Sequence, residues 1–510
     1  MATALGIELG STRIKACLVD ADDPSRVLAV GEHEWENQLV DGRWSYSRED
    51  VWAGVQAAYA ALVAALPEKP FSFGAIGVSA MMHGYLAFDA EGELLVPFRT
   101  WRNTSTGPAA AALTSAFGAN IPLRWSIAHL YQAVLDDEPH VGDISFLTTL
   151  AGYVHWKLTG SKVLGVGDAS GMFPIAAGGY DSGMLDAFER LAPGLRLPGL
   201  LPEVLLAGQP AGALTAEGAA LLDPSGALQA GVPLCPPEGD AGTGMVATNS
   251  VAPRAGNVSA GTSIFAMVVL ERPLATVHDE LDVVTTPAGD PVAMVHCNNG
   301  ASELAAWVSV FRRFADAAGA PVTSDAAYAA LFREALEGEP DAGGILAYNQ
   351  LAGEPIAGLD EGRPLVVRTS DSSFTLANFM RAQLYGVFAS LSLGMAVLDE
   401  EGVELDRMFA HGGIFRTAGV AQRFLAAALR TPVSNAETAS EGGPWGMAVL
   451  AAYSVSGGGQ SLAGYLHTEV FRGATFTVVE PYAEDVLGFS SYLDTYRAGL
   501  AIERAAAQSI

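Results

Sequence analysis

Cysteine is scarce in this chain of 510 residues, which has only Cys17, Cys235 and Cys297. Three widely spaced cysteines form no disulfide framework and match no zinc-ligand spacing, so a reducing compartment, the cytoplasm, is the simplest interpretation. The first residues carry no basic stretch before their apolar run, and no signal peptide is predicted. No apolar run approaches the roughly 18 to 20 residues of a membrane span. The sequence therefore predicts a soluble protein without a membrane partner.

Basic residues are also few, since 28 Lys and Arg stand against 56 Asp and Glu, a net charge of −28. Such a surface repels nucleic acids and anionic membranes, which excludes polyanions as expected partners. A substrate that carries phosphate would need hydrogen-bond donors supplied locally by its own site.

Apolar residues make up 50% of the chain and charged residues only 16%, which is enough apolar material for two large domains. Residues 5–9, 14–20 and 75–78 have the pattern of strands. Val51, Val55, Tyr59 and Leu62 follow Ser47 at helical spacing. Strands that alternate with helices predict an α/β architecture.

The predicted domain boundary lies where glycine and proline concentrate, at residues 231–244, because fresh strands begin near Asn257. We therefore expect an N-terminal domain at 1–244, a C-terminal domain at 245–460 and a helical extension at 461–510, packed on the body. Apolar positions from Met380 to Leu398 predict one buried face of a long helix. Residues 481–507 repeat the helical spacing.

An internal repeat is the most informative feature of the sequence. Gly6-Ile7-Glu8-Leu9-Gly10-Ser11-Thr12 and Asn257-Val258-Ser259-Ala260-Gly261-Thr262-Ser263 each consist of an apolar strand followed by glycine and two hydroxyl residues. The turn glycines are 261 − 10 = 251 residues apart, about half the chain. Consecutive amides in such a glycine turn, with Ser or Thr hydroxyls, form a concave nest for phosphate oxygens. Either turn alone could be a simple β-turn, whereas the pair indicates that a polyphosphate is gripped from two sides.

With these residues in hand, the chain resembles the FGGY carbohydrate kinases of the actin/Hsp70-like ATPase superfamily, and within them the xylulokinase branch. The resemblance covers about residues 4–455. Its further motifs are Ser79-Ala80-Met81-Met82-His83-Gly84, Trp101, Gly239-Asp240-Ala241, Gly353-Glu354-Pro355, His411-Gly412-Gly413 and Gly446-Met447-Ala448. The resemblance implies two RNase H-like α/β domains with a cleft between them for ATP and sugar, with Mg²⁺ as the metal. The implied activity is phosphorylation of a hydroxyl of a small ketose.

Asp240 is the expected catalytic base, because the family places its catalytic aspartate in this glycine-flanked loop. A carboxylate there would orient the sugar hydroxyl and accept its proton as the bond to phosphorus forms. The alternative for an isolated Gly-Asp is a turn aspartate that caps the next helix. Glu238, two residues away, is a competing carboxylate.

The resemblance also implies the residues that bind each substrate. Met82, His83, Trp101 and Asp240 would contact the sugar, and Glu8 and Asp240 would hold Mg²⁺. A lone histidine is more often structural, and a tryptophan more often lies in the core. The expected ATP contacts are Gly10, Ser11, Thr12, Arg13, Lys15, Gly261, Thr262, Ser263, Gly300, Gly412, Gly413 and Thr417.

Three positions depart from the family pattern. Glu8 stands where an aspartate is usual and extends the charge by one methylene, which matters because Mg²⁺ has strict geometric demands. His411-Gly412-Gly413 is not followed by the family's third glycine. Asn103 stands near the usual place of an aspartate after the tryptophan, which leaves D-xylulose, L-ribulose and other ketoses or polyols open as substrates.

Other classes of protein share parts of the pattern. An actin- or Hsp70-like ATPase without a sugar substrate shares both hairpins, but it does not explain Met82, His83 and Trp101. A pseudo-enzyme that binds sugar without catalysis is a further alternative, and its only support is Glu8 in place of the usual aspartate. A dinucleotide-binding oxidoreductase would need Gly-x-Gly-x-x-Gly opening a helix, whereas here a second strand follows Gly10. The sequence leaves a homodimer open.

Overall fold

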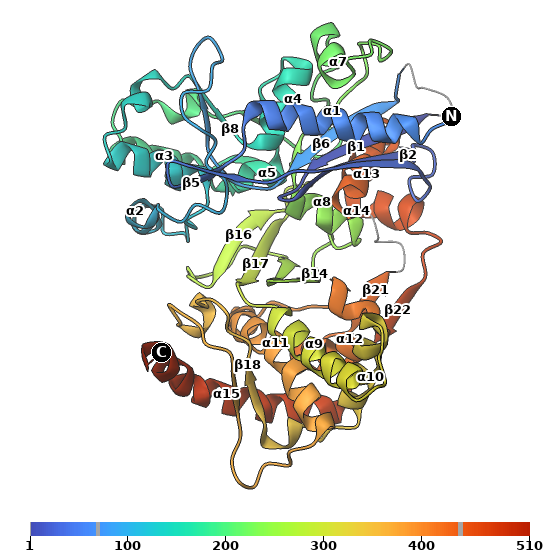
Figure 1. The fold of residues 1–510 in the computed structure, drawn as a ribbon. Coiled ribbons are helices and arrows are strands. Elements are labelled where there is room, and N and C mark those ends of the chain that lie inside the picture. The colour runs from blue at the N-terminus through green and yellow to red at the C-terminus, as the bar shows by residue number, and fades with distance from the viewer. Residues whose placement is uncertain (1, 68–71, 437–441, 510) are drawn as a thin grey trace. The chain divides into compact units, whose positions relative to one another are not determined.

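The computed structural model describes residues 2–67, 72–436 and 442–509 (Figure 1). The chain divides into two compact units. Unit 1 comprises residues 1–252, 282–292 and 438–474, and unit 2 comprises residues 253–281, 293–437 and 475–510. The chain therefore passes between the units several times.

The main sheet of unit 1 has the strand order β13-β6-β1-β2-β3. β1 pairs antiparallel with β2 and parallel with β6, which confirms the strands predicted at residues 5–9, 14–20 and 75–78. The bounds of the five strands are β1 Thr3–Leu9, β2 Arg13–Asp20, β3 Val27–Glu34, β6 Ala75–Ala80 and β13 Glu238–Gly239.

Helices α1 (Arg48–Ala64) and α13 (Gly443–Ser456) cover opposite faces of this sheet. A Cβ at Gly6 would lie 2.2 Å from the Pro444 carbonyl oxygen of α13, and a Cβ at Gly31 would lie 2.2 Å from the Ala58 carbonyl oxygen of α1. Gly31 is in register with Ala16, and Ala16 with Ile7, the neighbour of Gly6. Because successive residues of a strand face opposite sides, the two glycines let one helix approach each face.

Smaller elements complete unit 1. The first helix begins after Ser47, as predicted, and Ser47 caps it, because its side chain accepts a hydrogen bond from the Asp50 amide. The remaining helices are α2 Gly107–Phe117, α3 Ser126–Leu135, α4 Leu150–Thr159, α5 Val166–Ser170, α6 Ser182–Leu191, α7 Ala216–Leu222, α8 Asp240–Ala247 and α14 Leu462–Tyr465. The short strands are β4 Gln38–Val40, β5 Arg43–Ser45, β7 Leu86–Phe88, β8 Phe146–Thr148, β9 Val163–Gly165, β10 Ile175–Ala176, β11 Gly179–Tyr180 and β12 Glu203–Leu205.

The sheet of unit 2 repeats the strand order of unit 1. Its order β17-β15-β14-β20-β21 matches β3-β2-β1-β6-β13, and β22 is added beyond β21. β14 pairs antiparallel with β15 and parallel with β20, as β1 does with β2 and β6. The bounds are β14 Ala255–Ala260, β15 Ile264–Val269, β17 Pro291–Cys297, β20 Arg407–His411, β21 Val433–Ala436 and β22 Phe476–Val479. Residues 282–292, with most of β16 (Leu281–Thr285) and the start of β17, group with unit 1. The internal repeat of the sequence is thus a repeat of topology.

The core of unit 2 is built around α11 (Leu376–Glu400), which confirms the long helix predicted from Met380 to Leu398. Within the described residues, α11 is the one helix long and apolar enough to cross a membrane, but 78% of its apolar window is buried inside the protein. It is therefore the central helix of a folded core. The other elements of unit 2 are α9 Ser302–Ala317, α10 Ser324–Leu336, β18 Leu346–Tyr348, β19 Leu365–Val367, α12 Val420–Leu429 and α15 Ala483–Ser509.

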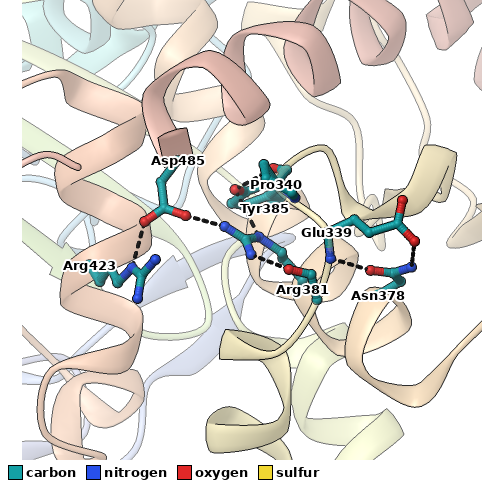
Figure 2. Close-up of polar contacts among 8 residues, drawn as sticks. Glu339, Pro340, Asn378, Arg381, Tyr385, Arg423 and Asp485 are labelled. Carbon is teal, nitrogen blue, oxygen red and sulfur yellow. Dashed lines mark hydrogen bonds and ion pairs between the residues drawn. The ribbon is translucent and has the colours of Figure 1, made fainter. Parts of the chain in front are cut away.

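The C-terminal helix α15 is attached to unit 2 by a buried charge network (Figure 2). The Asp485 carboxylate lies between the guanidinium groups of Arg381 on α11 and Arg423 on α12. Arg381 also donates to the Gly338 carbonyl at 2.6 Å and to the Tyr385 hydroxyl at 3.0 Å. Both partners of the central pair are at most 2% exposed, so neither charge can be satisfied by water.

Two local expectations differ from the structure. Residues 232–235, an apolar run expected to be strand-like, form only two isolated bridges, between Ile76 and Leu234 and between Ala213 and Pro233. The strand that joins the sheet is the later β13. Pro233 and the two prolines after Cys235 remove backbone donors from this stretch, which prevents a longer ladder. The segment 461–510 is not helical throughout, because β22 precedes α15 and pairs antiparallel with β21.

Candidate active site

Asp240 is the first residue of α8, directly after β13, and so lies at a strand-to-helix junction and not in an extended loop. β13 runs parallel to β6, which brings Asp240 beside the segment that follows β6. The Asp240 Oδ1 accepts hydrogen bonds from the amides of Met82 at 3.2 Å and Ala241 at 2.9 Å. The side chain is solvent-exposed but surrounded by many protein atoms. This desolvation raises its pKa, and the two amides and the Arg124 charge oppose the rise.

Glu238, the competing carboxylate, points away from solvent. It is 2% exposed and accepts hydrogen bonds from the amides of Gly167 and Asp168 at 3.3 Å and 3.0 Å. Burial, and then the charge of Asp168, raise the pKa of Glu238 to about 8. An enclosed carboxylate whose oxygens are engaged by backbone amides is poorly placed to touch a substrate. Of the two acids, Asp240 is the one open to a ligand.

Met82 and His83 follow β6 in a strained turn. His83 has a φ of +68°, which is uncommon for a residue other than glycine, and is 6% exposed. Its Nδ1 lies 3.1 Å from the Gly171 carbonyl oxygen, and its ring stacks on Trp125 with centroids 6.3 Å apart. Because a carbonyl can only accept, Nδ1 carries a proton, and Nε2 of the neutral ring is the acceptor nitrogen. Met82 is buried against Gly239, where a Cβ would lie 2.1 Å from Met82 Cγ.

Trp101 is 36% exposed, so it is not a core residue. Its Nε1 donates to the Ser11 hydroxyl at 3.2 Å, which joins a predicted sugar residue to a predicted phosphate residue. Asn103, in contrast, is buried, and its side-chain amide is used by the backbone of Trp44 and by the Thr100 carbonyl. Asn103 therefore supports the turn that carries Trp101 and does not face a ligand.

The turn of the first hairpin is held from behind by two aromatic residues that the sequence did not single out. Trp35 Nε1 donates to the Gly10 carbonyl at 2.7 Å, and the Trp35 amide donates to the Thr12 carbonyl at 3.1 Å. The Tyr46 hydroxyl donates to the Ser11 carbonyl at 2.6 Å. Trp35 and Tyr46 stack with centroids 4.1 Å apart. Three successive carbonyls are thus turned toward the protein, which pre-organises the turn.

The basic residues after this turn have different surroundings. Arg13 forms ion pairs with Glu32 at 3.4 Å and Glu34 at 2.9 Å on the exposed side of the hairpin. Lys15 is in register with Glu8, and its charge opposes the rise in the pKa of that carboxyl that burial causes. Lys15 is therefore beside the acids of the site, whereas Arg13 is engaged by neighbouring carboxylates.

Glu8 and Asp240 are the candidate metal ligands. Burial and then the Asp240 charge raise the pKa of Glu8 to about 8, against the effect of Lys15. A Cβ at Gly443 would lie 1.8 Å from Glu8 Oε1, so glycine is needed there to admit the longer glutamate. Among the described residues, no group of three His, Cys, Asp or Glu side chains could hold a metal. Two carboxylates nevertheless fit Mg²⁺, which is commonly bound by one or two of them together with waters and phosphate oxygens.

In unit 2, Gly261-Thr262-Ser263 forms the second hairpin turn, between β14 and β15. The Gly300 amide donates to the Thr262 carbonyl at 2.7 Å. A Cβ at Gly300 would lie 2.6 Å from the Gly261 carbonyl oxygen, and one at Gly412 would lie 2.1 Å from the Ala260 carbonyl oxygen. Gly300 and Gly412 are thus required by the packing of backbone against the hairpin. Packing does not require glycine at positions 261 and 413. A Cβ would meet nothing closer than 3.9 Å at Gly261 and nothing within 4 Å at Gly413.

A cavity of about 700 Å³ lies beside this second hairpin within unit 2. Gly261, Gly413 and Thr417, three of the expected ATP contacts, line it. Helix α10 supplies a wall that the sequence did not predict, which includes Tyr328 and Phe332. Because α10 bears no motif, only its packing could reveal that it borders this cavity.

Asp168 is a second residue that sequence reasoning missed. It is 1% exposed, accepts from the Thr149 hydroxyl at 2.6 Å, and leaves its Oδ1 without a hydrogen-bond partner among the described residues. Burial raises the pKa of Asp168 to about 7, with a further contribution from the Asp240 charge. The run Gly165-Val166-Gly167-Asp168 was the available signal, since closely spaced glycines mark a close approach of backbone.

The family models decide the class of the protein. The N-terminal domain of the FGGY family of carbohydrate kinases matches residues 3–246, and the C-terminal domain matches residues 256–455. The chain belongs to the FGGY family of carbohydrate kinases. As an FGGY kinase it is an enzyme that phosphorylates a sugar with ATP, and the predicted family is confirmed.

Relatives of this FGGY kinase include xylulose kinases. The xylulose kinase of Haemophilus influenzae is 23% identical over 433 residues, which cover 80% of this chain and 82% of that protein. The structure of a ligand-bound xylulose kinase from Lactobacillus acidophilus has a TM-score of 0.80 at 17% identity and covers 100% of this chain and 99% of its own. A gluconate kinase from the same organism has a TM-score of 0.79 at 16% identity, with the same coverage of both chains. The fold is therefore that of the FGGY kinases, an actin-like ATPase fold, as predicted.

Proposed function

We propose that this FGGY kinase transfers the terminal phosphoryl group of ATP to a hydroxyl of a pentulose. D-xylulose is the first candidate substrate and L-ribulose the second. The observation that carries the proposal is the hydrogen bond from the Met82 amide to Asp240, which joins the predicted base to the Met82-His83 pair. The similarity to the Haemophilus influenzae xylulose kinase over 80% of the chain supports the substrate class.

In the proposed reaction, Asp240 orients the acceptor hydroxyl and takes its proton as the sugar oxygen bonds to the γ-phosphorus. The bond from that phosphorus to the β–γ bridging oxygen breaks, and ADP leaves. The desolvated surroundings of Asp240 raise its pKa and make it a better proton acceptor. His83 Nε2 would accept a hydrogen bond from a second sugar hydroxyl, and the Trp101 ring would contact the C–H surface of the sugar.

The nucleotide contacts follow the repeat. In unit 1, Ser11 and Thr12, with Lys15 nearby, would donate to phosphate oxygens, and in unit 2 the second hairpin would do the same. The cavity beside Gly413 and Thr417 would hold the adenosine. Mg²⁺, held by Glu8 and Asp240 with phosphate oxygens, would neutralise charge on the transferring group.

We also propose that the enzyme acts in the cytoplasm. Cys235 and Cys297 are free thiols, and both are buried, as is Cys17. Thiols that remain unpaired suit a reducing compartment.

The experiment that tests the proposed function is a substrate panel with ATP and Mg²⁺, read by ADP release. The panel contains D-xylulose, L-ribulose, other pentuloses and hexuloses, D-gluconate and small polyols. We expect the highest kcat/KM with a pentulose. If kcat/KM is highest with D-gluconate or a polyol, that compound and not a pentulose is the substrate. ATP turnover that no sugar accelerates would overturn the proposed reaction.

A further inference from the structure

We propose that Glu238 is a positioning residue for the sugar site, which clamps strand β13 to helix α5 and so holds the Gly171 carbonyl against His83. The inference rests on the proposed function, since it concerns the sugar that His83 would bind. Glu238 does not touch the substrate. Its effect passes through the segment from Gly165 to Gly171.

The Glu238 carboxylate is enclosed by backbone donors. Besides the amides of Gly167 and Asp168, the Gly239 amide donates to it at 3.4 Å. The adjacent Pro237 carbonyl accepts from the Gly165 amide at 2.8 Å. Residues 237 and 238 thus make three hydrogen bonds to the segment 165–168. They lie at the start of the buried strand β13, so these bonds attach that strand to the segment.

Three glycines leave the space that this carboxylate fills. A Cβ would lie 2.2 Å from Glu238 Oε1 at Gly165, 2.4 Å from Oε2 at Gly167 and 3.3 Å from Oε2 at Gly242. Gly165 has a φ of −65°, which any residue adopts, so its conformation does not require glycine. At Gly165 and Gly167 the atoms that a side chain would meet first are those of the Glu238 carboxylate, whereas at Gly242 the Pro287 ring is slightly closer.

Helix α5 transmits this clamp to His83. The Ser170 hydroxyl donates to the Gly167 carbonyl at 2.6 Å, and the Gly171 amide donates to the Asp168 carbonyl at 3.0 Å, so the turn is fixed from end to end. The Gly171 carbonyl then faces His83 Nδ1, and a Cβ at Gly171 would lie 2.7 Å from that nitrogen. A shift of α5 would therefore weaken the hydrogen bond between His83 Nδ1 and the Gly171 carbonyl. That bond sets the tautomer and the orientation of the His83 ring.

The contacts close into a ring that includes the base. His83 follows Met82, the Met82 amide binds Asp240, and Asp240 is two residues after Glu238. A displaced Glu238 would disturb both the base and the histidine. The adenosine residues lie in unit 2 and take no part in this ring. The inference thus predicts a larger effect on the KM for the ketose than on the KM for ATP, whose adenosine contacts lie outside the ring.

The test is Glu238→Gln, which keeps the shape of the side chain but sets an amide NH₂ against a backbone N–H. We expect the KM for the best ketose to rise roughly tenfold, about the effect of one lost hydrogen bond, with a fall in kcat. The KM for ATP is expected to stay within about twofold, and His83→Ala to raise the ketose KM in the same way. Gly167→Ala, which crowds the carboxylate from the other side, should give the same pattern and replaces Glu238→Gln if that variant does not fold.

Asp223→Asn is the matched control. Asp223 is 7% exposed in unit 1 and accepts from the amides of Ser225 and Leu228, both at 3.0 Å, outside the ring described above. This control is expected to lower the melting temperature without changing either KM. An unchanged ketose KM in Glu238→Gln, an equal rise in both KM values, or the same split in Asp223→Asn would overturn the inference. Wild-type protein that phosphorylates no sugar would instead overturn the proposed function, and the inference with it.

Discussion

At the scale of single residues, four acidic side chains form an unusual group in the site of unit 1. Glu8, Asp168, Glu238 and Asp240 influence one another, and burial raises the pKa of each. The positive charges that act on them are those of Lys15, on Glu8, and Arg124, on Asp240. Arg124 is itself paired with Asp282. Such a group favours a bound cation or shared protons at neutral pH.

Asp240→Asn removes the proposed base while it keeps the size of the side chain. We expect kcat to fall by roughly 10² to 10⁴, the usual contribution of general base catalysis. The binding of ketose and of an ATP analogue, measured by calorimetry, should change little, because the amide oxygen can still accept from the Met82 amide. A variant with near wild-type turnover on the best ketose would show that Asp240 is not the base.

Glu8→Gln tests the effect of the buried acid on stability. The pKa of Glu8 is raised from its ordinary value of 4.5 to about 8, so between these pH values the folded state holds a proton that the unfolded state has lost. Its contribution to the free energy of unfolding is therefore full below about pH 4.5 and declines as the pH rises toward 8. Glutamine does not titrate, so the variant should gain stability relative to wild type over this range.

Urea unfolding at pH 5 and pH 8 measures that difference, and the exposed Glu91→Gln serves as the control, with no pH-dependent gain expected. Mg²⁺ with ATP should reduce the gain of Glu8→Gln, since a metal bound to the carboxylate favours its ionised form. A gain that shrinks as the pH rises would mean that Glu8 is ionised in the folded protein.

At the scale of elements, the ion pairs of Asp485 with Arg381 and Arg423 help to attach the last helix to its unit. Removing Asp485 would leave Arg381, 2% exposed, as a buried charge without its carboxylate (Figure 2). We expect Asp485→Asn to cost about 3–5 kcal/mol in the free energy of unfolding. Asp399→Asn is the matched control in the same unit, because its partner Arg430 is 64% exposed, and such pairs contribute about 0–1 kcal/mol. Equal losses in denaturant titrations would mean that the network does not hold α15.

At the scale of the whole molecule, the net charge of −28 opposes the approach of ATP. Raising ionic strength from about 0.01 to 0.15 M shortens the Debye length from about 30 to 8 Å and screens this repulsion. We expect kcat/KM for MgATP to rise over this range, and kcat/KM for an uncharged ketose to stay constant. A fall for MgATP would show that local positive charge, such as that of Lys15, outweighs the field of the whole protein.

Much of the fold could be predicted from the sequence because its signals are local or repeated. The alternating strands around Gly10, the cap at Ser47 and the apolar face from Met380 to Leu398 depend on periodicity and capping alone. Strand β22 could not be predicted, since half of its residues are partly buried and the others exposed, and its partner β21 is about forty residues earlier. The place of Asp240 at the start of a helix was also missed, because three nearby prolines obscure so short a strand as β13.

The sequence by itself determined the family, the repeat and the residues that could carry phosphoryl transfer, because these depend on motifs and their order along the chain. Only the tertiary structure decided which of these residues meet. Glu238 and Asp240 are two residues apart, yet Glu238 is buried among backbone amides of Gly167, Asp168 and Gly239, and Asp240 is open to a ligand. Gly300 and Gly413 both lack a side chain, yet Gly300 admits a neighbouring backbone and Gly413 lines a cavity. The reason is that burial and close approach come from segments far apart in the chain, which a local pattern does not contain.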